Sequence, residues 1–253
     1  MTFEKLEKYL RDDFGRVSGW CSAQLWQVFQ PVLEIQQRMG IVNPIAEIGV
    51  FQGKFFLGLL ASKEAPRANY AIDVFDMQQF NLDGSGDGNL NTLLENIDRC
   101  GFSRGQVTAL RADSTTITSR QIDEIRTDSK GFSLFSVDGC HLPEHTINDL
   151  NIAIQLTIPE GIIFIDDYTN MDWPGVQEAI HKHFFNSYSR FVPLAVAHNK
   201  LMLCHIGYHK GYLAAVRERL NAMKIAAKPI KLFGYDAVNV HLDPSSKEFV
   251  YRT

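Results

Sequence analysis

The chain has 253 residues, of which 45% are hydrophobic and 21% charged, and its formal net charge is −4. These values are ordinary for a globular protein with one large domain, and the lack of a long basic run argues against binding to a nucleic-acid backbone. The four cysteines are scattered without a C-x-x-C pair, which predicts reduced thiols in a cytoplasmic protein rather than disulfides or a zinc site.

The N-terminus is mixed in charge and predicts neither a signal peptide nor a membrane span. Large apolar residues recur near helical spacing in the first 40 residues. We therefore expect a helical cap over 1–40, a core over 41–207, and a C-terminal helix and tail over 208–253 packed on that core.

From residue 45 onward, short apolar strands alternate with helical patterns. The predicted strands are 45–49, 69–74, 106–111, 132–138, 161–166, 191–197 and 201–206. The predicted helices are 54–64, 89–100, 117–126, 143–157, 174–187 and 208–224. This rhythm predicts an α/β fold with a mostly parallel sheet, helices on both faces, and a C-terminal hairpin formed by the last two strands. The sequence leaves open whether 230–241 adds a strand.

Residues 45–53 read I-A-E-I-G-V-F-Q-G, a strand that ends near Glu47 and Gly49 and turns toward Gly53 and an apolar helix. Glycine at these two positions lets the backbone come close to a ligand. A second strand ends 20 residues past Gly53 at Asp73, whose carboxylate can accept hydrogen bonds from ribose hydroxyls. The pattern predicts a nucleoside-type cofactor bound by these four residues.

The spacing argues against a dinucleotide, because Phe51 stands where G-x-G-x-x-G has its middle glycine. The pattern E-x-G-x-x-x-G instead resembles the first motif of class I S-adenosylmethionine-dependent methyltransferases. That resemblance implies S-adenosylmethionine as cofactor and a Rossmann-like, mostly parallel seven-stranded sheet closed by an antiparallel hairpin. A strand–turn–helix with two convenient glycines remains the alternative at this point.

All five predicted parallel strands carry acids at their carboxyl ends: Glu47, Asp73, Asp113, Asp138 and the pair Asp166-Asp167. Ligands of an open parallel sheet bind at this edge, and carboxylates on one rim repel each other unless cations or hydrogen-bond donors gather them. S-adenosylmethionine supplies a sulfonium, an ammonium, two ribose hydroxyls and an adenine amine. Asp113 and Ser114 are predicted to face the adenine, a role compatible with capping the next helix.

The segments F-S-V-D-G-C-H at 135–141 and I-I-F-I-D-D-Y at 162–168 bring three carboxylates to neighbouring strand ends. Asp138, Asp166 and Asp167 are predicted to bind a divalent cation, Mg²⁺ first, because hard cations prefer oxygen ligands. Adjacent strand residues point to opposite faces, so the last two can share a site only if the chain turns there.

These segments, followed by Pro174-Gly175-Val176, resemble the metal-dependent O-methyltransferases, and most of all the bacterial branch that includes macrolide-sugar O-methyltransferases such as macrocin O-methyltransferase. The resemblance covers about residues 45–185. It implies methyl transfer to a hydroxyl of a sugar or another small polar metabolite. Asp138, which also faces the cofactor's amine, and His141 are the candidate catalytic residues, with His141 as the base that takes the hydroxyl proton. A loop histidine without a catalytic role is the alternative reading.

The loop 81–89 reads N-L-D-G-S-G-D-G-N and matches the start of an EF-hand, but Leu94 stands where the bidentate glutamate is required. We predict a glycine-rich lid instead, and a solvated turn is the alternative. Three other functions remain open for the chain: a metal-independent methyltransferase, a non-catalytic cofactor-binding regulatory module, and an iron hydroxylase on the same fold. The expected partner is a small-molecule acceptor, and whether the chain forms a homo-oligomer is left open.

Overall fold

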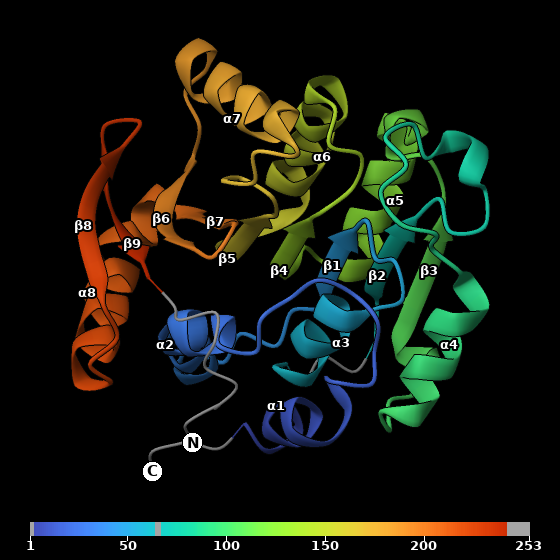
Figure 1. Cartoon of the computed structure of the whole chain (residues 1–253), viewed down its shortest axis with the longest axis horizontal. Helices are drawn as coiled ribbons and strands as arrows, with labels where there is room; N and C mark the ends of the chain where they lie inside the picture. Colours follow the sequence, from blue (N-terminus) through green and yellow to red (C-terminus); the bar gives the residue numbers. More distant parts are fainter. Residues whose placement is uncertain (1–2, 64–66, 242–253) are drawn as a thin grey trace.

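The computed structural model describes residues 3–63 and 67–241, which form one nine-stranded sheet with helices on both faces (Figure 1). The strands are β1 (Ile45–Ile48), β2 (Asn69–Asp73), β3 (Val107–Arg111), β4 (Phe132–Val137), β5 (Thr157–Ile165), β6 (Phe191–Ala197), β7 (Lys200–His205), β8 (Ala227–Leu232) and β9 (Tyr235–Val240). The α-helices are α1 (Glu4–Lys8), α2 (Leu25–Arg38), α3 (Lys54–Ala61), α4 (Leu90–Arg99), α5 (Ser119–Ser129), α6 (Pro143–Leu156), α7 (Pro174–Asn186) and α8 (Ile206–Ala222). A π-helical turn, Tyr9–Asp13, continues α1.

The order of the strands across the sheet determines where a ligand can enter. That order is β3-β2-β1-β4-β5-β7-β6-β9-β8. Strands β1 to β5 pair in parallel, and β7 lies antiparallel between β5 and β6. The chain winds outward from β1 to β3 and then returns to place β4 on the other side of β1. Such a switch point opens a crevice at the carboxyl ends of the strands, where ligands bind in α/β sheets.

Two helical layers cover the sheet. Helices α1, α2, α3, α4 and α8 lie on one face, and α5, α6 and α7 lie on the other (Figure 1). Strand β1 shows how one short run serves both layers, because successive side chains alternate between faces: Ile45 belongs to the core under the first layer and Ala46 to the core under the second.

Local sequence explains where the elements around the site begin. Proline at the first position starts both α6 and α7, where its missing N–H has no helical partner to lose. Gly49 has φ +83°, and a Cβ there would overlap the Asp138 carbonyl at the end of β4. Gly53 precedes α3 with φ +93°. Only glycine adopts this backbone without strain, so these two positions shape the turn after β1.

The predicted elements are confirmed to within a few residues, and residue 64 of the expected first core helix lies outside the described residues. The predicted strand count of seven is too low, because residues 227–240 form the hairpin β8–β9 and β9 pairs in parallel with β6. The C-terminal segment thus extends the sheet as well as packing on it; residues 242–253 are outside the described range. In the described part of the chain, no helix is long and apolar enough to cross a membrane.

The contact between α2 and α3 gives a stability prediction. A Cβ at Gly58 of α3 would overlap the ring of Trp26 in α2. Alanine normally favours a helix over glycine by about 1 kcal/mol, but overpacking a core costs about 1–3 kcal/mol. We therefore expect Gly58→Ala to lower the free energy of unfolding by about 1–2 kcal/mol in urea titrations. Gly211→Ala in α8, where a Cβ would meet nothing within 4 Å, should raise it; equal effects at both sites would contradict this account of the packing.

Candidate active site

A cavity of about 630 Å³ opens at the carboxyl edge of the parallel strands. Its wall comes from the strand ends, the loop after β2, the segment before α2 and the segment before α7. The residues that line it include Trp20, Gly49, Phe51, Asp73, Phe80, Ser85, Gly86, Gly88, Asp113, Ser114, Asp138, His141, Asp166, Asp167, Trp173 and Asn199. The predicted convergence of acidic strand ends on one hollow is therefore confirmed for four of the five strands.

Two predicted cofactor residues do not reach the cavity wall. Glu47 lies within β1 and is only 1% exposed, because its side chain points to the layer of α2 and α3, on the same side of the sheet as Lys200. Burial raises the pKa of its carboxyl to about 8, although the positive charge of Lys200 acts in the opposite direction. Gly53 serves as the turn before α3. Neither residue is in the cavity lining, so neither supports a direct contact with a ligand there.

Asp73 ends β2 at the cavity, where the ribose prediction requires it. The backbone N–H of Phe51 donates to its Oδ2 at 2.8 Å, and the N–H of Phe75 donates to Oδ1. Burial raises the pKa of Asp73, while these backbone donors act against the rise. The carboxylate therefore braces the turn after β1 and still faces the hollow.

Asp113 and Ser114 follow β3 and also line the cavity. Asp113 Oδ1 accepts a hydrogen bond from the Thr115 N–H at 2.9 Å and caps the short 3₁₀ helix Ser114–Thr116. The next predicted helix, α5, is instead capped by Thr118, so Asp113 caps only this short turn. Ser114 is buried at the cavity wall, and the position of both residues is compatible with the predicted contact with an adenine.

Asp166 and Asp167 share one site because the chain turns as β5 ends. Strand β5 stops at Ile165, and Asp167 adopts a left-handed backbone with φ +55°. Such a backbone is uncommon for a residue with a side chain and needs support from its surroundings. The Asp167 carboxylate receives that support from the amides of Asn170 and Asn199, at 2.8 and 2.7 Å.

Asp166 has a protein cation of its own. The ammonium group of Lys200, from β7, forms an ion pair with Asp166 Oδ2, and the Asp167 N–H donates to Oδ1 at 2.9 Å. Lys200 is only 2% exposed and also lies 4.3 Å from the centre of the Phe55 ring. Burial works against the charged lysine, but the carboxylates of Asp166 and Asp138 outweigh it and raise its pKa. The sequence signal for this residue was a lysine that opens an otherwise apolar strand.

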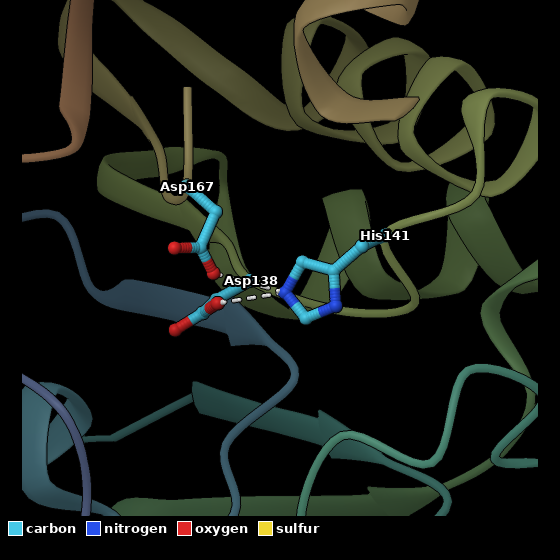
Figure 2. A group of neighbouring side chains, drawn as sticks. All are labelled: Asp138, His141 and Asp167. Carbon is cyan, nitrogen blue, oxygen red and sulfur yellow. Dashed lines mark ion pairs between the residues drawn. The ribbon is translucent and has the colours of Figure 1, made fainter. Parts of the chain in front are cut away.

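Three other side chains form a group that can hold a metal ion. One ligand atom each from Asp138, His141 and Asp167 lies within 4.8 Å of the others, and Figure 2 shows the His141 ring facing both carboxylates. His141 Nε2 is 3.0 Å from Asp167 Oδ2 and 3.9 Å from Asp138 Oδ1. Among the described residues, this buried nitrogen makes no hydrogen bond of good geometry. Carboxylate oxygens with one imidazole suit a divalent cation, so the residues present fit the predicted metal.

His141 is held on several sides and is only 8% exposed. Its ring stacks on Trp173 at 4.4 Å between centroids, with 16° between the planes. Its Nδ1 lies 2.7 Å from Asp83 Oδ2. Burial alone would lower its pKa, but Asp167 and Asp83 outweigh burial and raise the pKa of His141 to about 9. Asp83 was noted in the sequence only as part of a loop, and its pairing with His141 was not predicted.

Burial also raises the pKa of Asp138 well above its usual range, with a further rise from the neighbouring Asp166. The aromatic residues Trp20, Phe51, Phe80 and Trp173 reach the cavity, whereas Phe75 and Tyr168 are buried in the two cores on either face of the sheet. Trp20 packs on Phe51 at 5.1 Å, which brings the N-terminal segment over the cavity mouth.

The chain is similar to known proteins in sequence and in fold. A family model described as a methyltransferase domain matches residues 46–168. No curated protein matches the chain.

Several solved structures share the fold. The O-methyltransferase NovP has a TM-score of 0.56 at 15% identity, over 72% of this chain and 79% of its own. CalS11, a TDP-rhamnose 3'-O-methyltransferase of calicheamicin biosynthesis, has a TM-score of 0.51 at 16% identity, over 81% of this chain and 93% of its own. The mycinamycin-pathway methyltransferase MycE, in complex with Mg and SAH, has a TM-score of 0.53 at 15% identity, over 79% of this chain and 54% of its own. At such identities the likeness shows a common fold.

The raised pKa of His141 predicts a pH-dependent contribution to stability in the metal-free protein. A group whose pKa is raised on folding stabilises the fold below its unfolded pKa, about 6.5 for histidine, and loses that contribution as the pH rises through the folded value, here about 9. In EDTA, the loss of unfolding free energy caused by His141→Gln should therefore be larger near pH ~6 than near pH ~10 in urea titrations.

The exposed His241 provides the matched control, because His241→Gln should change stability little at either pH. A deficit for His141→Gln that stays constant over this range would show that the two carboxylates do not hold a proton on the ring.

Proposed function

We propose that this chain is a class I S-adenosylmethionine-dependent methyltransferase that transfers a methyl group to a hydroxyl of a sugar or another small polar metabolite with the help of a divalent cation. One observation carries the proposal. Five aspartates from four strand ends face a single cavity of about 630 Å³, and at its floor the carboxylates of Asp138 and Asp167 come together beside His141 Nε2.

The cofactor would occupy the side of the cavity beneath β1, β2 and β3. Asp73 is placed to accept from the ribose hydroxyls, since it faces the hollow beside the turn after β1. Asp113 and Ser114 would contact the adenine. Gly49 and Asp138 line the wall at the switch point between β1 and β4, where a carboxylate would meet the ammonium group of the methionine part. Glu47 and Gly53, which lie outside the cavity lining, would act only through the turn after β1.

A divalent cation would be held by Asp138 and Asp167, with Mg²⁺ as the first candidate. Asp166, the third predicted ligand, would lie next to the cation without binding it directly, because the ion pair with Lys200 already neutralises the Asp166 carboxylate. When bound, such a cation lowers the pKa of a coordinated hydroxyl and fixes its orientation. The Mg ion in the MycE structure supports this assignment by analogy of fold.

His141 would take the proton of the acceptor hydroxyl. In the transfer, the acceptor oxygen forms a bond to the methyl carbon as the carbon–sulfur bond breaks, the sulfonium becomes a neutral thioether, and the proton goes to His141 Nε2. The ring must be neutral before it can accept. The charge of Asp167 helps to keep the ring protonated, so a cation that occupies Asp167 would favour the neutral, basic ring.

Two kinds of observation support the proposed class of acceptor: the residues at the mouth of the cavity and two structures of similar fold. CalS11 is described as acting on TDP-rhamnose, and MycE was solved with mycinamycin VI. In this chain, the exposed Trp20 and Phe80 border the cavity next to its polar floor. Flat apolar surfaces beside carboxylates suit a sugar ring, which presents C–H faces and hydroxyl edges.

The cofactor assignment predicts a loss of affinity in Asp73→Asn. Hydrogen bonds to a charged acceptor contribute about 1.5–3 kcal/mol, so we expect roughly 10- to 100-fold weaker binding of S-adenosylhomocysteine in calorimetry. Asp76→Asn is the matched control, because Asp76 is exposed, pairs with Arg111 and lies outside the cavity lining. Unchanged affinity in Asp73→Asn would remove Asp73 from the ribose site.

The metal assignment predicts that wild-type protein binds Mn²⁺, followed by electron paramagnetic resonance, and that Asp167→Asn weakens this binding by roughly tenfold or more. Asp123→Asn on the exposed face of α5 should leave it unchanged. Turnover of S-adenosylmethionine with a sugar acceptor should fall in EDTA and return with Mg²⁺. Turnover that is indifferent to EDTA, in protein that binds no Mn²⁺, would favour the metal-independent alternative, in which Asp138 serves only the cofactor's amine.

A further inference from the structure

A carboxylate outside the strand ends reaches His141 from the loop that follows β2. Asp83 Oδ2 accepts a hydrogen bond from the His141 backbone N–H at 2.7 Å and also lies 2.7 Å from its ring Nδ1. The other oxygen, Oδ1, accepts from the Ser85 N–H at 3.0 Å and from the Ser85 hydroxyl at 2.7 Å. The Asp83 side chain is only 4% exposed although its neighbours Leu82 and Gly84 are exposed. This part of the loop is therefore a specific contact with the active site rather than a solvated turn.

The contact determines which nitrogen of His141 is available. A carboxylate accepts hydrogen bonds and does not donate them, so the nitrogen that faces Asp83 must carry a proton. In the neutral ring this leaves Nε2 without a proton. Nε2 is the atom that points toward Asp167 and Asp138 at the floor of the cavity. The stack on Trp173 fixes the plane of the ring.

We propose that Asp83 is the positioning residue for His141. By keeping a proton on Nδ1 and holding the ring in place, it leaves Nε2 basic and directed at the hydroxyl that is to be methylated. This inference rests on the proposed function for its catalytic meaning, but the positioning itself can be measured without any acceptor.

The loss of Asp83 has a defined structural consequence. In the part of the chain that the structure describes, Asp83 is the acceptor that meets Nδ1, and the nearest carboxylate on the other side of the ring is Asp167, at Nε2. A neutral ring without Asp83 gains more by placing its proton on Nε2, where Asp167 accepts it. The nitrogen that should take the proton of the acceptor hydroxyl would then be occupied.

The same loop also lies against the cofactor side of the cavity. A Cβ at Gly88 would lie 3.1 Å from Asp73 Oδ1, and one at Gly86 would lie 3.3 Å from the Phe51 ring. The loop conformation that brings Asp83 to His141 is thus the one that fits closely around the ribose side. The contact of the loop with the ribose side and the position of the His141 ring therefore depend on the same loop conformation.

The test compares Asp83→Ala and Asp83→Asn with Asp87→Ala. Asp87 lies in the same loop, is exposed, and is absent from the cavity lining. Protein labelled with ¹⁵N in histidine is examined by NMR in EDTA with S-adenosylhomocysteine, with His141→Gln used to assign the signals. In wild type and Asp87→Ala we expect the neutral His141 ring to carry its proton on Nδ1. In Asp83→Ala the proton should move to Nε2, and the His141 backbone amide should exchange faster.

With an acceptor that is turned over, Asp83→Ala should lower kcat by roughly tenfold or more and leave the KM for S-adenosylmethionine within about threefold of the wild-type value. Asp87→Ala should leave both kcat and KM unchanged. Asp83→Asn keeps the size of the side chain but places an amide donor beside Ser85 or His141, so it should fall between the two. An unchanged proton position and amide exchange in both Asp83 variants would overturn the inference even if the protein is an active methyltransferase. Failure of the wild type to bind S-adenosylhomocysteine would instead count against the proposed function. In that case, NMR spectra recorded without S-adenosylhomocysteine would still show whether Asp83 determines the proton position on His141.

Discussion

The structure depends on bringing carboxylates together at one edge of a parallel sheet, where their mutual repulsion must be offset. Each one is met by a different kind of partner. Backbone N–H groups donate to Asp73, the side-chain amides of two asparagines donate to Asp167, and a buried lysine pairs with Asp166. In the described part of the chain, Asp138 is supported at longer range, by His141 Nε2 at 3.9 Å and by the charge of Lys200, while the neighbouring Asp166 carboxylate opposes its ionisation. Among these four aspartates, Asp138 is therefore the one at which a positively charged ligand would offset most repulsion.

The sequence was sufficient for the parallel part of this fold because each strand there is a short, apolar run with a turn after it, and burial on both faces makes such runs easy to read. It was insufficient for β8 and β9. Strand β8 contains Lys228, Pro229 and Lys231 and lies at the edge of the sheet, where proline and lysine are tolerated. Its partner β9 pairs with β6, about 40 residues earlier in the chain. Pairing between distant segments leaves no local pattern, so the attachment of β9 to β6 emerges only from the packed structure.

The site residues likewise fall into those that local sequence could place and those that depend on distant contacts. Strand ends could be placed from the sequence, since parallel strands deliver them to one edge, and Asp73, Asp113, Asp138, Asp166 and Asp167 all reach the cavity. The direction of a single side chain could not be placed in this way. Glu47 faces the helices under the sheet because of its position within β1. The partners of the rim were also hidden, because Lys200 arrives from the adjacent antiparallel strand and Asp83 from a long loop. Both contacts join residues far apart in the chain, and charge alone does not indicate which lysine or aspartate will be buried.

The charges at the floor explain why the site suits a cationic ligand. The groups concerned are Asp83, Asp138, Asp166, Asp167, Lys200 and His141. When all of them are charged, two negative charges remain in excess. Without a ligand, this excess holds protons, because the pKa of Asp138 is well above its usual range and that of His141 is raised to about 9. A divalent cation held there would offset most of the negative charge and would compete with those protons, since ligands bind metal in their deprotonated forms. Under the proposed function, cation binding would therefore favour loss of the proton from His141, and the same electrostatics would link the presence of the ion to the availability of the base.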